Sequence, residues 1–196
     1  MNNITLIGID LGKHSFHIHC QDKQGNALLR KKLTRTQLTA FLSTSQSAVV
    51  VMESCAGAHF MARHIQPLGH QVKLISPQFV RPFVKSNKND FVDAEAICEA
   101  ASRPSMRFVQ PRTETQQAMR ALQRVRESLV RDRVKTTNQI HAFLPEFGIS
   151  LPEGEAVIKR LSLVLAEHDV PDYLSRLLMK LHARYLYLVE PITALE

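Results

Sequence analysis

The chain has 196 residues, of which 44% are hydrophobic and 22% charged, and this balance excludes a disordered or fibrous protein. A net charge of +7 favours an anionic partner, with nucleic acid first and an anionic membrane surface second. The three cysteines form no Cys-x-x-Cys pair, the N-terminus shows no signal-peptide pattern, and no apolar stretch reaches the ~20 residues that span a bilayer. We therefore expect a soluble, cytoplasmic protein with no membrane partner.

The first part of the chain has the pattern of an antiparallel meander. An apolar run over residues 4–10 predicts a buried strand. Residues 14–21 alternate, with His17 and His19 on the more polar side, and this predicts a half-exposed second strand. A turn signal then leads into a third strand over 27–33.

The next part alternates helices with strands. Thr34 and Thr36 can cap a short helix, and the β-branched run at 48–52 predicts a strand buried on both faces. A helix over 57–68, a strand over 70–75 and a helical turn beginning at Pro77 follow. Strands that alternate with helices after a meander indicate an α/β fold with a mixed sheet.

Beyond residue 89 the pattern is mainly helical. We predict one short strand over 106–109 and, separated by breakers, helices over 90–102, 113–147, 155–167 and 172–189.

Four carboxylates lie at the ends of predicted elements. Asp10 and Glu53 each follow an apolar strand, at the sheet edge where α/β proteins place their sites. Asp90 and Asp93 are three residues apart at the start of a helix, so they share one face near the positive end of the helix dipole. If that helix packs across the sheet edge, all four converge. Each acid also has a structural explanation when taken singly, such as a helix cap for Asp90, and Glu53 after its apolar run is the hardest to explain in that way.

Converging carboxylates repel one another strongly unless cations lie among them. Hard divalent cations prefer oxygen ligands, and two such ions about 3.5–4 Å apart are the usual device for displacement at a phosphodiester. The set therefore predicts a catalytic centre with two Mg²⁺ ions, and Mn²⁺ as an alternative. No histidine is assigned to a metal, because an exposed hairpin face explains His17 and His19.

Several blocks of the sequence resemble, in order and spacing, the N-terminal domain of DEDD-type transposases of the insertion sequence 110 family. This family includes the pilin-gene invertases and the bridge-RNA-guided recombinases. The blocks are GIDLGKHSFHIHCQD, VVVMESCAGAHF, LGHQVKLISPQFVRPFVKSNKNDFVDAEAICEA and RVKTTNQIHAFLPEFGI. They cover about residues 4–150, and the segment KNDFVDAEAI is the most specific.

The resemblance implies an α/β, ribonuclease-H-like (RuvC-like) mixed sheet with helices, followed by a long-helix extension. Residues 1–108 are expected to form the catalytic domain, 109–150 a long basic, coiled-coil-like helix, and 151–196 a helical segment leading toward a second domain. Family members carry in that second domain a serine proposed as the nucleophile of strand exchange, and no segment here matches it. The implied function is magnesium-dependent DNA cleavage and exchange during transposition, incomplete in this chain and directed in some members by an element-encoded guide RNA.

The motif match also assigns residues. It carries the family's catalytic, metal-binding acids onto Asp10, Glu53, Asp90 and Asp93. Basic residues in or beside the same motifs would contact DNA or RNA phosphates, and these are Lys13, Lys85 and Lys88.

The long predicted helix carries much of the excess positive charge, at Arg120, Arg124, Arg131, Arg133 and Lys135. A solvated face is the usual explanation of such a run. Because the excess here is of one sign, phosphate contact with a strong salt dependence is favoured.

An apolar stripe lies beside this charge. Leu122, Val125 and Leu129 step by three and four, which is typical of a helix that packs against another helix. The partner is either the 172–189 helix of the same chain or a second subunit of a homo-oligomer.

Two alternatives stay open on the sequence alone. An ATPase of the actin and sugar-kinase type shares the strand-hairpin core, but the seven glycines are scattered and form no second phosphate loop. A non-catalytic nucleic-acid-binding remnant or regulator would keep the same carboxylates without turnover.

Overall fold

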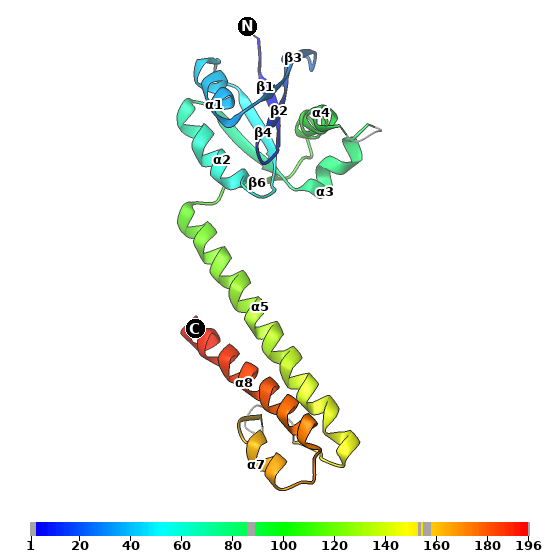
Figure 1. Cartoon of the computed structure of the whole chain (residues 1–196). Helices are drawn as coiled ribbons and strands as arrows, with labels where there is room; N and C mark the ends of the chain where they lie inside the picture. Colours follow the sequence, from blue (N-terminus) through cyan, green and yellow to red (C-terminus); the bar gives the residue numbers. More distant parts are fainter. Residues whose placement is uncertain (1–2, 86–88, 153, 155–157, 196) are drawn as a thin grey trace. The chain divides into compact units, whose positions relative to one another are not determined.

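The computed structural model describes residues 3–85, 89–152, 154 and 158–195 (Figure 1). The chain forms two compact units, Met1–Gln116 and Gln117–Glu196. The long helix α5, Glu114–Phe143, begins in the first unit and continues through the second. None of the helices in the described ranges combines enough length with enough apolar character to cross a bilayer.

The first unit is built on a six-stranded mixed sheet with the order β3-β2-β1-β4-β5-β6. The first three strands form the predicted antiparallel meander, β4 and β5 run parallel to β1, and β6 returns antiparallel to β5. The bounds are β1 Leu6–Leu11, β2 Phe16–Gln21, β3 Ala27–Leu33, β4 Val49–Glu53, β5 Gln71–Ile75 and β6 Phe108–Val109.

Helices cover both faces of this sheet (Figure 1). α1 and α2 lie against one face and α4 lies against the other. Their bounds are α1 Arg35–Thr44, α2 Ala58–Ile65, α3 Pro77–Val80 and α4 Asp90–Ala101, with short 3-10 turns at Gln66–Leu68 and Arg81–Phe83. The predicted cap of α1 is confirmed, because the Thr34 side chain accepts from the Gln37 N–H and the Gln37 side chain accepts from the Thr34 N–H.

The apolar core has a layer on each face of the sheet. Successive residues of a strand point to opposite faces, so β4 sends Met52 to one layer and Val51 to the other. Met52 packs with Ile9 on the side of α1 and α2, whereas Val51 packs with Ile75 and Ile97 on the side of α4. This is the predicted ribonuclease-H-like α/β arrangement.

The predicted half-exposure of the second strand is wrong. Every residue of β2 is buried, with His17 only 4% and His19 only 1% exposed. Helix α4 packs over this side of β2, where the Cys98 thiol donates a hydrogen bond to the His19 carbonyl and Phe91 contacts the His17 ring. The polar face of β2 is therefore covered by a helix that lies far along the chain.

The second unit is helical. After α5 come a 3-10 turn at Pro145–Phe147, α7 at Leu161–Ala166 and α8 at Asp172–Ala194, and residues 155–157 of the predicted 155–167 helix lie outside the described residues. One buried apolar cluster joins the last turns of α5 to α7 and α8, and it includes Ile140, Leu144, Leu165, Leu178 and Tyr185. The predicted pairing of the long helix with the last helix is therefore found, but at the C-terminal part of α5. Of the predicted stripe, Leu122 is 48% and Val125 53% exposed.

Candidate metal centre at the carboxyl edge of the sheet

Two carboxylates lie next to each other at one edge of the sheet. The parallel register of β1 and β4 sets Ile9 opposite Met52, so Asp10 and Glu53 are the next residues on the two strands. Both side chains are partly buried. Because parallel strands end at the same edge, the two acids share one site although they are far apart along the chain.

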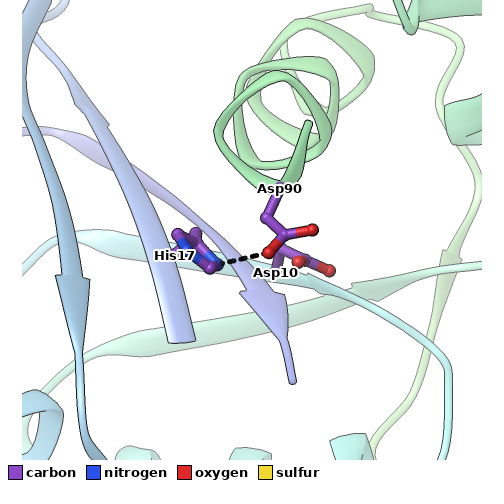
Figure 2. Close-up of side chains that lie close together, drawn as sticks. All are labelled: Asp10, His17 and Asp90. Atoms are coloured by element: carbon purple, nitrogen blue, oxygen red, sulfur yellow. Dashed lines mark ion pairs between the residues drawn. The ribbon is translucent and has the colours of Figure 1, made fainter. Parts of the chain in front are cut away.

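Helix α4 adds two further carboxylates to this edge. Asn89 caps the helix by accepting a hydrogen bond from the Phe91 N–H, so Asp90 and Asp93 occupy the first turn. The helix packs over β1 and β2. Figure 2 shows Asp90 pointing from the start of this helix toward Asp10 and His17 on the two strands below.

The charges of these acids act on the pKa values of Asp10 and Glu53. Burial raises the pKa of Asp10, and the negative charges of Asp93 and Asp90 raise it further, against a smaller lowering effect of His17. Burial also raises the pKa of Glu53, followed by the charges of Asp10 and Asp93. Asp93 thus acts electrostatically on both Asp10 and Glu53, whereas Asp90 acts on Asp10. Among the described residues only Asp10 and Asp90 of the four acids belong to a tight group of possible metal ligands, so the convergence of all four stays a prediction.

His17 is a fifth member of this cluster and was missed by the sequence analysis. It faces Asp10 directly across the β1–β2 hairpin, and its Nδ1 lies 3.4 Å from Oδ2 of Asp90. The ring packs edge-on against Phe91, with 4.7 Å between centroids. One possible ligand atom from each of Asp10, His17 and Asp90 lies within 4.8 Å of the others. In the described part of the chain, these three residues form the group whose donor atoms are close enough to share one metal ion.

The predicted phosphate-binding residues have different surroundings. Lys13 is exposed in the β1–β2 turn, two residues beyond the end of β1. Lys85 is exposed but paired with Glu95, with 3.3 Å between Nζ and Oε1, and Arg30 contacts the same carboxylate at 2.7 Å. Lys88 lies outside the described residues. On α5, Arg133 is partly buried, and the exposed members are Arg120, Arg124, Arg131 and Lys135.

The donor set fits a divalent cation. Burial and neighbouring negative charge raise the pKa of Asp10 and of Glu53, and positive charge among these acids would offset that repulsion. Carboxylate oxygens are also the ligands that hard divalent ions prefer. The buried Nδ1 of His17 faces the same acids and makes no hydrogen bond within the described part of the chain. Asp10 and His17 are positioned by paired strands, whereas Asp90 is 61% exposed and free to adjust.

A sheet of this order, with acids near the ends of β1 and β4 and in the first turn of α4, defines a ribonuclease-H-like protein. Residues 7–149, well over half of the chain, match the sequence model of the DEDD transposases of the IS110 type, and the chain belongs to this family. The match agrees with the blocks that carried the resemblance in the sequence.

Curated relatives bear names of the same kind. The chain is 72% identical over its whole length to a Yersinia enterocolitica protein named as the transposase for insertion sequence element IS1328, of which it covers 59%. It is 44% identical over 86% of its length to a probable family 20 transposase of Pseudomonas aeruginosa, covering 51% of that protein. It is 40% identical over 87% of its length to the transposase for insertion sequence element IS1111A of Coxiella burnetii, covering 47%. The chain thus spans about half the length of these relatives, and their names favour the transposase interpretation over the actin or sugar-kinase alternative.

Proposed function

We propose that this chain is the metal-dependent DNA-cleaving part of an insertion-sequence transposase. The observation that supports the proposal is that Asp10 and Asp90 lie in one donor group at the sheet edge, while the charge of Asp93 raises the pKa of both Asp10 and Glu53. Family membership supports DNA as the substrate. The activity would be carried out in the cytoplasm and in concert with segments that the longer relatives contain.

The four carboxylates would hold the metal, with two Mg²⁺ ions proposed and Mn²⁺ as an alternative. When bound, divalent ions at such a site lower the pKa of an attacking hydroxyl and neutralise charge on the leaving oxygen. Asp10 and Glu53 offer oxygens from paired strands, so their spacing is set by the sheet. Asp90 and Asp93 would complete the site from the first turn of α4.

Basic side chains would position the nucleic acid. Lys13 is at the same edge as Asp10, only three residues further along the chain. The exposed arginines of α5 would bind phosphates without reading sequence, because no base-stacking aromatic residues interleave them. An element-encoded guide RNA would be bound by the same contacts between basic side chains and phosphates. A homo-oligomer would bury the exposed apolar stripe at Leu122 and Val125.

The test compares isosteric variants in strand cleavage and in binding. Asp10→Asn and Asp90→Asn remove charge without changing shape, so each should lower metal-dependent nicking of DNA at least about a hundredfold while DNA binding measured by fluorescence anisotropy persists. Asp169→Asn, at an exposed acid of the second unit, is the matched control and should nick as the parent does.

The assay is run on the chain and on a chimera that completes it with the remaining segment of the Yersinia relative. Cleavage that survives both aspartate substitutions would refute the metal assignment. Firm DNA binding by a completed chimera that never cleaves would favour the non-catalytic binding protein instead.

A further inference from the structure

His17 is a buried polar group whose hydrogen bonding is incomplete. Its side chain is only 6% exposed, and Nδ1 makes no hydrogen bond within the described residues. Oδ2 of Asp90 lies 3.4 Å from Nδ1, a distance that suits an ion pair but not a short hydrogen bond. Buried polar atoms are nearly always satisfied in native proteins, so such an atom calls for a functional explanation.

Two other buried histidines, His70 and His59, have structural explanations. His70 uses both ring nitrogens, because Nδ1 accepts from the Ala48 N–H at 3.3 Å and Nε2 lies 2.9 Å from the Leu42 carbonyl. His59 likewise contacts the backbone and side chain of Arg112. His19 and His182 also have an unpartnered ring nitrogen, at Nδ1 and at Nε2, but in the described chain neither belongs to a group of three metal-ligating side chains. His17 combines an open ring nitrogen with two carboxylates.

The geometry suits coordination of one ion by three side chains. Ligands at about 2.0–2.2 Å from an ion lie up to about 4.4 Å apart across it, and the donor atoms of Asp10, His17 and Asp90 all lie within 4.8 Å of one another. The strand pairing holds Asp10 and His17 in place, and the exposed Asp90 needs only a small rotation to close the group.

We infer that His17 is a metal ligand through Nδ1, so the centre combines nitrogen and oxygen donors and binds first-row transition ions such as Mn²⁺ better than an all-carboxylate site does. Imidazole is most favoured by ions such as Zn²⁺, Fe²⁺ and Ni²⁺. Mn²⁺ shares the preference of Mg²⁺ for oxygen ligands but, as a transition ion, accepts a nitrogen ligand more readily than Mg²⁺ does. The inference rests on the proposed metal centre and adds to it a residue and an ion preference. A purely structural His17 would instead only position Asp90 and pack against Phe91.

The test uses electron spin-echo modulation of Mn²⁺ bound to the full chain, which detects nitrogen nuclei bonded to the ion. We expect histidine nitrogen coupling in the parent chain and its loss in His17→Phe, which keeps the ring and its contact with Phe91. The same variant should weaken Mn²⁺ binding on the order of tenfold in calorimetry and change Mg²⁺ binding less than about twofold. His19→Gln is the matched control on the same face of β2 and should keep the coupling.

The outcomes separate this inference from the proposed function. Bound Mn²⁺ that shows oxygen ligands alone in the parent chain would overturn the role of His17 and leave the carboxylate centre intact. Mn²⁺ binding that Asp10→Asn does not weaken would overturn the centre itself. The spectrum of the parent chain decides the question even if His17→Phe misfolds, and His17→Asn then supplies the assignment with a smaller side chain.

Discussion

Gly8 lies directly beneath Ala94: a Cβ at position 8 would stand 2.5 Å from the Ala94 carbonyl oxygen and 2.7 Å from Sγ of Cys98. The absence of a side chain therefore lets α4 rest on the backbone of β1. Gly8 and Asp10 are two residues apart and face the same side of the strand. The close approach at Gly8 is what brings the first turn of α4 to the sheet edge.

Gly8→Ala should therefore impair both stability and the metal centre. Both clashing atoms are packed and cannot move aside cheaply, so we expect a loss of roughly 1–3 kcal/mol in urea unfolding. Displacement of α4 should also weaken Mn²⁺ binding. The matched control is Ile9→Val, on the opposite face of β1, which should cost about 0.5–1.5 kcal/mol and leave Mn²⁺ affinity unchanged. Equal Mn²⁺ affinity in the two variants would mean that the packing of α4 on β1 does not determine the geometry of the metal centre.

Thiol chemistry gives an independent measure of how tightly α4 is seated. Burial raises the pKa of Cys98 and of Cys20 to about 12, and Cys55 is only partly buried. Thiolates are the reactive form, so iodoacetamide should label Cys55 first and the other two only on unfolding. Mass spectrometry of the native chain checks the order. In Gly8→Ala the labelling of Cys98 should speed up, whereas rapid labelling of Cys98 in the parent chain would show that the helix opens freely.

The carboxylates could be predicted from sequence because their positions are local. A strand that ends near an acid and a helix that begins with two acids can be recognised in short stretches of sequence. The parallel pairing of β1 and β4 then places Asp10 and Glu53 at the same edge of the sheet. The burial of His17 could not be predicted in this way. The alternation of β2 is that of a half-exposed strand, and the cover on its polar face comes from α4, many residues later.

Counting register from the hairpin would have identified His17. The tight turn in which the Gly12 N–H donates to the Ser15 carbonyl sets Asp10 opposite His17. The predicted intrachain partner of the stripe on α5 is wrong for a different reason. A long helix repeats its apolar spacing along its length, so periodicity predicts that a partner exists but not which turns it covers, and the described cluster uses Ile140 and Leu144 while Leu122 stays exposed.

The stability of the metal-free protein should depend on pH with a definite sign. Burial and the charges of Asp93 and Asp90 raise the pKa of Asp10 above its ordinary 3.8, so the folded state binds this proton more tightly than the unfolded state. The associated stability is fully present below pH 3.8 and is lost as pH rises through the folded pKa. Asp10→Asn cannot ionise, so it should melt about 2–4 °C higher than the parent at pH 7.5.

The higher melting temperature expected of Asp10→Asn should approach that of the parent when the pH is lowered toward 4.5. Mn²⁺ should also offset the difference, because it stabilises only the parent. Asp22→Asn is a control of opposite sign, because a hydrogen bond from the Asn26 side chain lowers the pKa of Asp22. Its stability contribution is present above the ordinary pKa and is lost as pH falls, so this variant should gain nothing at pH 7.5. Thermal melts at the two pH values check both. If Asp10→Asn melted at a lower temperature than the parent at pH 7.5, ionised Asp10 would not destabilise the metal-free fold, contrary to the expectation.

The exposed arginines of α5 should account for a measurable part of the salt dependence of DNA binding. Removing one phosphate-binding side chain lowers the slope of log affinity against log salt by about 0.9 on duplex DNA, so replacing Arg124 and Arg131 with Ala should flatten it by about 1 to 2. The control replaces Arg30 and Arg103, which are paired with Glu95 and Glu99 and remove the same formal charge. Its slope should change little, because those guanidinium groups are already neutralised. If both double variants flattened the slope alike, net charge and not binding by the helix would be the cause. If only the α5 variant did so, and equally on unrelated sequences, the helix would position the backbone while leaving the choice of site to other parts of the assembly.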